Sequence, residues 1–541
     1  MRRHSLFLCL AAICGFAQPP APGTIEIRRL PEFHLPARIG VLGESRLTLE
    51  DVLKRVLEND ADLRVTRIAR EQAGYQVRAA EGAYDPVVGL QAYRTKEVSP
   101  VASVLGGTAT GKLTQTELSV TPTVSGVTQS GGSYSFTLSN SRQQSDSLFL
   151  TLNPQYPTRA TLNLTQPLLR GLRFDPNRYR VEVARKNTRL STEQVRQHII
   201  ERLTVAINAY WELAYARQNY QVQSEAVRLA QQQYESNRRQ AEQGVLAPVD
   251  VIAAQTQVAT FQQSAIAAQQ QLTEAENNLK AIMLPDREDP MWNVAVVPQT
   301  EVDVRPTVLP LRDAVDQALS SRPEITENAI ALAVNRLDVR LSSDQTKPQV
   351  NAYANLSANG LSGLPMPAGS NPFGSLLPGL STQIPGLFVG NYGQSLSNLF
   401  GANFPTVQFG VEISLPWRNR TAGAQLAVAE SEGRKLKVVR DQIAMAIEAD
   451  VRNALQAVTS AEARLSAAIL ARESAEEQYE SEQRQFQAGN STVFFVLQRQ
   501  TDLIAARSRE VRAKADLGEA KANLDRATAN TIEAHDIKTA F

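Results

Sequence analysis

The clearest pattern of apolar positions along the chain repeats every seven residues. In the stretch 177–243, which contains neither glycine nor proline, the pattern falls on Leu213, Tyr220, Val227 and Tyr234. A second stretch, 423–488, carries it at Ile447, Val451, Ala454, Val458, Ala461, Leu465 and Ala468. A period of seven is typical of long helices that pack side by side as coiled coils. We therefore predict two very long helices.

A sharp turn and a second helix follow each long helix. Gly244 and Gly489 end the two long stretches, and glycine is the usual residue after a helix end because it readily adopts a positive φ. Pro248 then marks the first turn of a return helix that ends near Pro285. Thr492–Asn530 is the matching helix of the second half. The chain thus contains two long helical hairpins.

Ahead of each long helix, the apolar period changes from seven to two. Alternation occurs in four segments, Val87–Glu97, Arg159–Gln166, Gln349–Ser357 and Thr406–Leu415. Alternation predicts strands. Connecting segments rich in glycine, serine and proline lie at Val98–Thr158 and Ala358–Pro405, and within the first of them Leu118–Val124 and Ser133–Ser139 look like an additional hairpin. The expected fold class is mainly α, with four strands per chain in a smaller β part.

The whole arrangement occurs twice in the sequence. Tyr234–Leu279 aligns with Tyr479–Leu524 without a gap, and both segments open with Tyr-Glu-Ser. An internal repeat predicts two tandem structural repeats in one pseudo-symmetric body. The expected divisions are a first repeat at 47–284, a linker at 285–310, a second repeat at 311–530 and a tail at 531–541.

The N-terminal residues predict export from the cytoplasm. Residues 1–17 combine a basic start, an apolar stretch and small residues at the end, as a secretory signal peptide does. Cleavage there would remove Cys9 and Cys14, the two cysteines of the chain, and lipid attachment at Cys14 is a less favoured alternative. Residues 18–46 are rich in proline and predict an extended segment. No later segment is apolar enough for a transmembrane helix.

Composition and motifs argue against nucleic acid as a partner and against catalysis. The 56 basic and 55 acidic residues leave a net charge of +1, which gives no general attraction to nucleic acid. The histidines lie far apart, at His4, His34, His198 and His535. Segment 106–112 lacks the Ser or Thr that a phosphate-binding loop carries after its lysine. We expect no enzyme activity, no metal site and no cofactor.

Four strands in an exported chain raise the question of a membrane. Lipid cannot satisfy the backbone groups at the edge of an open sheet. If the strands span a membrane, the chain must therefore oligomerise. Three copies would supply twelve strands, within the size range of outer-membrane barrels.

The chain resembles TolC-like outer membrane efflux proteins. The resemblance rests on the pattern Leu47-Thr-Leu-Glu-Asp-Val-Leu, on the turns at Gly244 and Gly489, and on the strand ends at Pro167 and Pro416. It implies a homotrimer in the outer membrane, with a twelve-stranded β-barrel and a helical tunnel in the periplasm. It also implies a periplasmic adaptor (membrane fusion protein) and an inner-membrane pump as partners. The protein would be the exit duct of a tripartite efflux pump that passively conducts small molecules to the exterior.

The resemblance further implies that the far tips of the hairpins meet the adaptor. The tip residues are Gly244, Val245 and Leu246 in the first repeat and Gly489, Asn490 and Ser491 in the second. Gly-Val-Leu matches the family pattern, whereas Gly-Asn-Ser departs from it. The two glycines are also ordinary helix terminators, and both roles are compatible.

The tunnel entrance would lie in the return helices just past the turns. Asp250 stands where the first repeat of the family often has aspartate, and three converging carboxylates would repel one another, bind cations and narrow the entrance. The helix dipole also favours an acidic residue in a first turn, and this alternative stays open. In the second repeat, the equivalent residues Phe495 and Gln498 depart from the acidic residues of well-known members, and together with Phe494 they suggest an apolar, amide-lined gate. We expect at least one of these phenylalanines to pack between helices.

Other functions stay open at this point. An exit duct of a type I protein secretion system would have the same design, and the sequence does not separate it from small-molecule efflux. A periplasmic coiled-coil adaptor or scaffold that never enters a membrane also has long helical hairpins, but one rather than two. The long connecting segments would lie at the outer surface, where they either fold over the mouth or have no fixed role.

Overall fold

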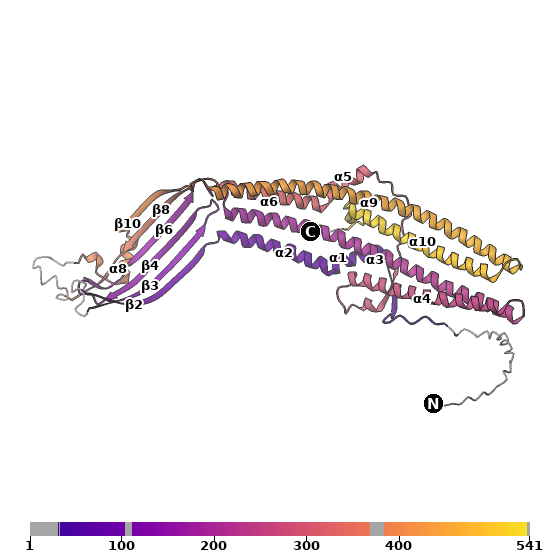
Figure 1. The fold of residues 1–541 in the computed structure, drawn as a ribbon. Coiled ribbons are helices and arrows are strands. Elements are labelled where there is room, and N and C mark those ends of the chain that lie inside the picture. The colour runs from indigo at the N-terminus through magenta and orange to yellow at the C-terminus, as the bar shows by residue number, and fades with distance from the viewer. Residues whose placement is uncertain (1–30, 32, 103–110, 368–383, 538–541) are drawn as a thin grey trace, which may run out of the picture. The chain divides into compact units, whose positions relative to one another are not determined.

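The computed structural model describes residues 31, 33–102, 111–367 and 384–537. The expected signal peptide, with Cys9 and Cys14, lies outside the described residues. The chain forms two compact units, shown in Figure 1. The helical unit comprises the residues through Asp60, Arg202–Leu309 and Arg452–Arg526. The sheet unit comprises Ala61–Glu201, Pro310–Val451 and the residues from Ala527 onward.

One antiparallel sheet dominates the sheet unit (Figure 1). Its main strands follow the spatial order β10-β8-β6-β4-β3-β2. Their bounds are Val87–Pro100 for β2, Lys112–Val127 for β3, Ser133–Ser145 for β4, Thr158–Pro167 for β6, Gln349–Gly360 for β8 and Phe404–Ser414 for β10. Two short strands, β5 (Leu152–Gln155) and β9 (Gly363–Pro365), pair with each other, and β5 also pairs with β4.

The predicted strands are all present, but the expected number per chain needs a correction. The four alternating segments form β2, β6, β8 and β10, and the additional hairpin forms β3 and β4. Because β3 pairs with β2 and β4 pairs with β6, the hairpin belongs to the same sheet. The sheet therefore has six long strands rather than four. The sequence predicts the hairpin but not its place in the sheet, because its polar face is rich in serine and threonine and strand pairing leaves no local pattern.

The longest helices, α3 (Pro176–Glu242) and α9 (Arg420–Gln487), contribute residues to both units. The Asp175 carboxylate accepts hydrogen bonds from the backbone N–H groups of Asn177 and Arg178 at 2.8 and 3.1 Å, so Asp175 caps the start of α3. The other helices of the sheet unit are α2 (Ala61–Glu81), α5 (Leu311–Ser321), α6 (Pro323–Gln345), α8 (Tyr392–Phe400) and α11 (Thr531–Ala534). Among the helices that the structure describes, none has the length and apolar character needed to cross a membrane.

Two long hairpins make up most of the helical unit. Helix α3 turns back into α4 (Pro248–Met283), and α9 turns back into α10 (Val493–Ala527). A shared core lies between them and includes Val227 and Tyr234 of α3, Phe261 of α4 and Ile504 of α10. Two heptad positions of α3 are therefore buried against other helices, as the seven-residue period predicts.

The segment before the first repeat and the linker between the repeats meet in the helical unit. Strand β1 (Gly43–Leu47) pairs in parallel with β7 (Val294–Pro298), and α1 (Leu49–Asn59) follows β1. Upstream of β1, Arg38 forms an ion pair with Glu276 of α4 at 2.6 Å. Glu276 also pairs with Lys280 at 2.6 Å, and both of these side chains are buried. The described part of the N-terminal segment is thus attached to α4.

Candidate functional site

The two hairpin tips have the same backbone geometry. Gly244 and Gly489 adopt φ values of +77° and +79°. In the first tip, the N–H of Gly244 donates to the carbonyl of Ala241 at 3.0 Å, and the N–H of Val245 donates to that of Gln240 at 2.9 Å. The second tip repeats both bonds at the corresponding residues, with the same distances. This pair of bonds defines a Schellman motif, which requires a left-handed residue after the helix.

The residues after the two glycines give the tips different surfaces. Val245 is 71% exposed, whereas the next residue, Leu246, is half-buried and packs on the core between the hairpins. In the second tip Asn490 is exposed, and the Ser491 hydroxyl donates to the Glu482 carboxylate. The first tip therefore presents an apolar side chain to the surroundings, and the second presents polar groups.

Asp250 lies in the first turn of α4, as its sequence position predicts. Its side chain is half-buried, and within the described part of the chain no basic group lies within 4.0 Å of its carboxylate. The partial positive charge at the helix N-terminus favours this carboxylate. The geometry of one chain therefore leaves both interpretations of Asp250 in place, the entrance carboxylate and the ordinary helix-start residue.

Phe494 and Phe495 do not pack between the helices of the chain, so that expectation is wrong for a single copy. They are 66% and 51% exposed, and their rings meet edge to face with centroids 5.6 Å apart. The neighbouring Val493 and Val496 fill the core instead. One turn further on, the exposed Gln498 side chain donates to Asp502 at 3.1 Å. The first hairpin has an exposed apolar residue in the same region, Val249, which sequence reasoning missed.

The candidate entrance residues of the two hairpins lie close together in the helical unit. Val251, next to Asp250, and Val493, next to Phe494, belong to the same buried cluster. Two turns further along, Gln257 of α4 donates to the Thr501 hydroxyl of α10 at 2.9 Å. Figure 1 shows both tips at one end of this unit. The return helices α4 and α10 thus bring both sets of residues to one place.

One face of the sheet carries an apolar row that crosses all six long strands. The registers align one apolar residue from each of the six strands in a single row, Val88, Val124, Phe136, Leu162, Leu356 and Val407. Several of these side chains are exposed in the single chain, among them Val88 at 76% and Val407 at 61%. A large exposed apolar face marks a surface that is covered by lipid or by another protein.

The opposite face of the sheet is polar. The adjacent row consists of Gly89, Thr123, Thr137, Thr161, Ser357 and Thr406. The next row carries Ser135, Asn163, Asn355 and Gln408, and the Asn163 amide donates to the Ser135 hydroxyl at 3.1 Å. Across these rows, apolar residues on one face and mainly polar residues on the other are the pattern of a wall between lipid and water.

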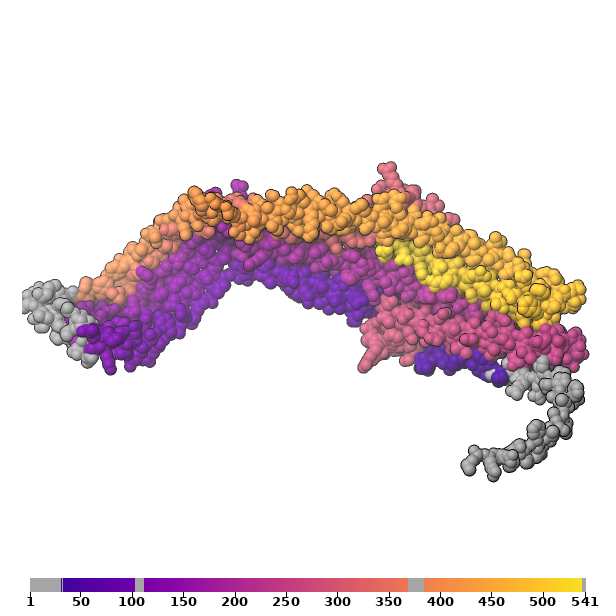
Figure 2. All heavy atoms as spheres, viewed as in Figure 1, coloured from indigo at the N-terminus to yellow at the C-terminus, as the bar shows by residue number. Residues whose placement is uncertain are grey.

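Both edges of the sheet are open. In the part of the chain that the structure describes, β2 pairs only with β3, and β10 pairs only with β8. Figure 2 shows the orange atoms of the second half along one border of the sheet and the purple atoms of the first half over the rest. Because all neighbouring pairs are antiparallel and the number of strands is even, the two edge strands run in opposite directions.

The connecting segments contribute ordered structure at the far end of the sheet. Helix α8 lies within the second segment and contacts the ends of β6 and β8, where the Thr158 and Ser395 hydroxyls are 2.8 Å apart. Residues 103–110 and 368–383 of these segments lie outside the described residues. Whether the segments restrict a mouth stays a prediction.

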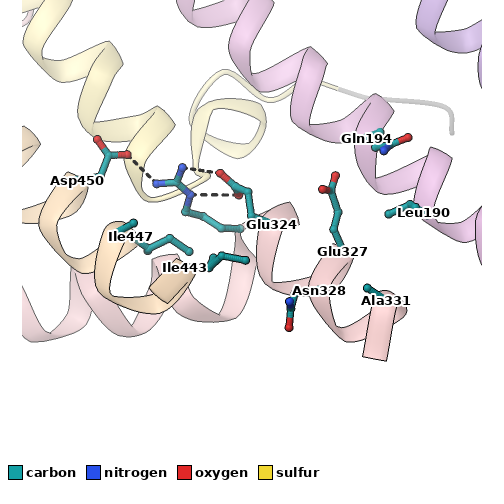
Figure 3. A pocket seen from close by; sticks show the side chains of 11 residues that line it. Leu190, Gln194, Glu324, Glu327, Asn328, Ala331, Ile443, Ile447 and Asp450 are labelled. Carbon is teal, nitrogen blue, oxygen red and sulfur yellow. Dashed lines mark hydrogen bonds and ion pairs between the residues drawn. The ribbon is translucent and has the colours of Figure 1, made fainter. Parts of the chain in front are cut away.

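Sequence reasoning also missed a hollow of about 680 Å³ in the sheet unit, between α3, α6 and α9 (Figure 3). Arg322 lines it, with ion pairs to Glu324 at 2.6 Å and to Asp450 of α9 at 2.7 Å. Glu327 of α6 also lines the hollow. Its burial, and then the nearby carboxylates Glu324 and Glu193, raise the pKa of Glu327. The charged residues are spread over three helices, so no local sequence motif predicts that they lie together.

Comparisons with known proteins agree with this geometry. The sequence pattern of a family described as outer membrane efflux protein matches residues 52–283 and 314–530. A comparison with curated proteins finds no match to the chain.

Solved structures of channels share the fold. CusC, which forms a transmembrane channel, has a TM-score of 0.62 at 16% identity, covering 92% of this chain and 98% of that chain. The CmeC outer membrane channel of Campylobacter jejuni has a TM-score of 0.60 at 14% identity, covering 93% and 94%. The outer membrane protein VceC of Vibrio cholerae has a TM-score of 0.60 at 16% identity, covering 89% and 95%. The resemblance inferred from the sequence is thereby confirmed.

Proposed function

Because the chain belongs to the outer membrane efflux protein family, we propose that it is an outer-membrane channel and the exit duct of a tripartite efflux pump. Three copies assemble into one channel. The sheet units form the wall in the outer membrane, and the helical units form a tunnel in the periplasm. An inner-membrane pump and a periplasmic adaptor deliver small molecules, which the channel conducts passively to the exterior.

The two-faced sheet with open edges is the observation that supports this function most directly. The apolar row through Val124 and Leu356 suits lipid, and the polar row through Thr123 and Ser357 suits a water-filled lumen. Lipid does not tolerate the unpaired backbone groups of β2 and β10. Copies arranged head to tail in a ring satisfy both edges, because β10 of one copy meets the antiparallel β2 of the next. A periplasmic scaffold that never enters a membrane would not need a sheet with an apolar row and open edges.

The tips and the return helices supply the other two parts of the duct. The exposed Val245 and the half-buried Leu246, with the polar Asn490 and Ser491, form the surface that meets the adaptor. The Gly244 and Gly489 turns hold these residues at the tips. This assignment is supported by the matching Schellman motifs of the two hairpins.

The entrance of the duct combines a charged and an apolar element. Asp250 supplies a carboxylate from each copy, and Phe494, Phe495 and Gln498 supply an apolar and amide-lined constriction. The exposure of both rings in a single chain supports this role, because an exposed phenylalanine pair needs a partner surface or a narrow lumen to cover it.

The test is to purify the full-length protein from the membranes of an expressing cell and to measure its mass and conductance. We expect extraction only with detergent, a particle mass of three chains by native mass spectrometry, and stepwise channel openings in planar bilayers. A monodisperse monomer in detergent-free buffer with an intact sheet contradicts the proposal. A trimer in detergent that never conducts contradicts the channel function but not the assembly.

A further inference from the structure

The β3–β4 hairpin continues the two faces of the sheet without a break. On β3, the residues Leu118, Val120, Pro122 and Val124 share the apolar face. On β4, the residues Tyr134, Phe136 and Leu138 continue it. The alternate residues are Ser119, Thr121, Thr123 and Ser125 on β3 and Ser135, Thr137 and Ser139 on β4. The hairpin therefore has the same division between lipid and water as the strands on either side of it.

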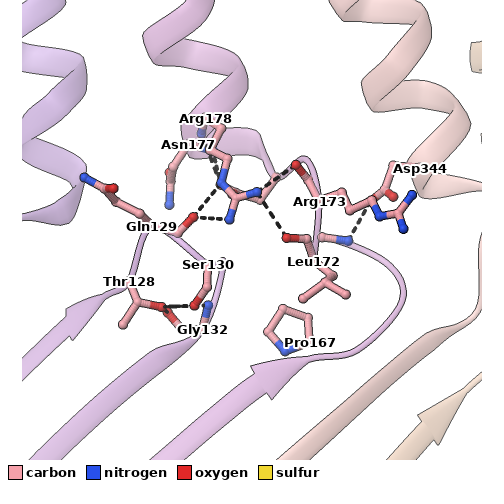
Figure 4. A network of polar contacts seen from close by, with 12 residues as sticks. Thr128, Gln129, Ser130, Gly132, Pro167, Leu172, Arg173, Asn177, Arg178 and Asp344 are labelled. Carbon is pink, nitrogen blue, oxygen red and sulfur yellow. Dashed lines mark hydrogen bonds and ion pairs between the residues drawn. The ribbon is translucent and has the colours of Figure 1, made fainter.

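The turn of the hairpin is attached to the body of the protein (Figure 4). The Arg178 guanidinium, in the first turn of α3, donates from Nε to the carbonyl of Gln129 at 2.6 Å. The same guanidinium donates to the carbonyls of Leu172 and Arg173 at 3.1 and 2.7 Å. One side chain thus joins the β3–β4 turn to the connection between β6 and α3. A hairpin that projected away from the wall would not need this link.

Further bonds join the same turn to the end of β6. The Ser130 hydroxyl donates to Oε1 of Gln166 at 3.0 Å, and Nε2 of Gln166 donates to the carbonyl of Ser130 at 3.0 Å. Gly131 adopts a φ of +79°, and a Cβ there would overlap the carbonyl oxygen of Gly171. The backbones of the two connections are therefore packed against each other, and glycine is required at 131.

The path of the chain allows the hairpin to be inserted without disturbing the rest of the sheet. Ala92, Val120, Asn140 and Thr158 occupy one row across β2, β3, β4 and β6. The chain leaves β2 and enters β6 at the same end of the sheet, and β3 and β4 run down and back between them. The hairpin adds two strands and leaves the directions of β6, β8 and β10 unchanged, so both edges can still pair antiparallel.

We propose that the β3–β4 hairpin spans the outer membrane as part of the channel wall, so that the trimer closes with eighteen strands and a wider lumen than twelve strands would give. This inference rests on the trimeric channel proposed above. Strands about 4.8 Å apart and tilted by about 40° give a wall diameter of about 36 Å for eighteen strands and about 24 Å for twelve. A lumen of the larger size accommodates bulkier solutes, and most of the polar side chains that line the added strands are hydroxyl groups.

The first experiment maps the two faces in the intact protein. Cys9 and Cys14 are replaced, and single cysteines are introduced at Val120, Thr121, Phe136 or Thr137 in channels reconstituted into lipid vesicles. We expect a membrane-impermeant maleimide to label the cysteines at 121 and 137 several-fold faster than those at 120 and 136. Oxygen dissolved in the lipid should in turn speed the electron-spin relaxation of nitroxide labels at 120 and 136 more than that of labels on the polar face. Equal maleimide labelling of both faces of the hairpin overturns the inference.

A matched pair on β6 separates this inference from the proposed function. Leu162→Cys and Asn163→Cys sit beside Phe136 and Ser135 in the same sheet. If the labelling rate differs between the two positions on β6 but not between the two faces of the hairpin, the wall exists without the hairpin, and only the inference fails. If positions 162 and 163 on β6 are also labelled at equal rates, the sheet is not a membrane wall, and both the inference and the proposed function fail.

The second experiment measures the width of the outer mouth. Residues 95–156 are replaced by a short glycine-serine turn, which joins β2 to β6 near the row that Ala92 and Thr158 share. Polyethylene glycols of graded size are then added from the side of the outer mouth while single-channel current is recorded. We expect the radius of the largest polymer that enters to fall by about a third or more, in proportion to the number of strands. An unchanged size limit in a conducting trimer overturns the inference, and the labelling experiment decides the question if the shortened chain does not assemble.

Discussion

At the scale of single residues, Asp250 is the only charged side chain among the proposed entrance residues. Three copies of this carboxylate around one axis would attract cations and repel one another. We expect Asp250→Ala to raise single-channel conductance or to weaken block by divalent cations in planar bilayers. Asp441→Ala, which removes an exposed carboxylate from α9, is the matched control and should change neither. No change in conductance or block with Asp250→Ala removes this residue from the gate.

Glu327 gives a prediction for pH at the same scale. Burial and the carboxylates of Glu324, Glu193 and Glu201 raise its pKa above the ordinary value of 4.5, while His198 lowers it. The folded state therefore binds the proton more tightly than the unfolded chain, and stability is lost as pH rises through the folded-state pKa. We expect Glu327→Gln to raise the apparent Tm at neutral pH, and the gain should disappear below about pH 4.5.

A neighbouring substitution provides the control for this prediction. Glu324 lies one turn earlier on α6 but forms an ion pair with Arg322. Glu324→Gln should therefore lower the apparent Tm at neutral pH, by an amount on the order of 1 kcal/mol in unfolding free energy. A gain with Glu324→Gln, or a loss with Glu327→Gln, would show that the charges around the hollow do not act as described.

At the scale of elements, the attachment of the β3–β4 turn leads to a prediction that compares two glycines. Gly131 and Gly171 both adopt positive φ values, +79° and +82°, but only a Cβ at 131 would overlap backbone atoms of the facing connection. Gly171→Ala should cost about 1 kcal/mol through its backbone conformation alone. Gly131→Ala adds the overlap and should cost about 1–3 kcal/mol more.

Apparent Tm values of the two variants in the same detergent test this difference. A glycine in a regular helix with open space around it, Gly74 of α2, gives the reference, because Gly74→Ala should be neutral or slightly stabilising. Equal losses at 131 and 171 would mean that the β3–β4 turn is not held against the β6–α3 connection.

The elements differ in how well the sequence predicts them. The heptads around Leu213 and Ile447 extend over many turns, so the long helices and their glycine ends followed directly from sequence. The β3–β4 hairpin was predicted too short and without a place in the sheet, because its alternating side chains are valine and leucine against serine and threonine in a segment rich in glycine. Strand pairing depends on partners far away in sequence, and no local pattern determines the register of β4 with β6.

The candidate site shows the same division between local and distant information. The tip glycines and Asp250 are set by their positions in a helix, and the structure places them where the sequence predicts. The exposure of Phe494 and Phe495 depends on which side of α10 faces α4, and a heptad with several alanines defines that face poorly. Val493 and Val496 occupy the core there instead of the larger rings.

At the scale of the whole molecule, the edges of the sheet determine how copies can associate. Strands β2 and β10 differ in sequence and run in opposite directions, so a head-to-tail ring pairs the β2 edge of one copy with the β10 edge of the next. A two-fold interface would instead pair β10 with β10. The two arrangements predict different covalent products when cysteines are introduced at the edges.

The decisive variants carry Leu90→Cys on β2 together with Val407→Cys, Phe409→Cys or Val411→Cys on β10. In a head-to-tail ring, oxidation of at least one double variant should give covalent dimers and trimers on a denaturing gel, and each single variant should stay monomeric. A two-fold interface would cross-link a β10 single variant to itself and stop at dimers. In a ring, one repeated contact between β2 and β10 satisfies the backbone hydrogen bonds at both edges of every sheet. Any sheet that crosses a lipid bilayer must meet this condition. Dimers from the single variants would therefore contradict the closed channel itself, whatever the number of strands in its wall.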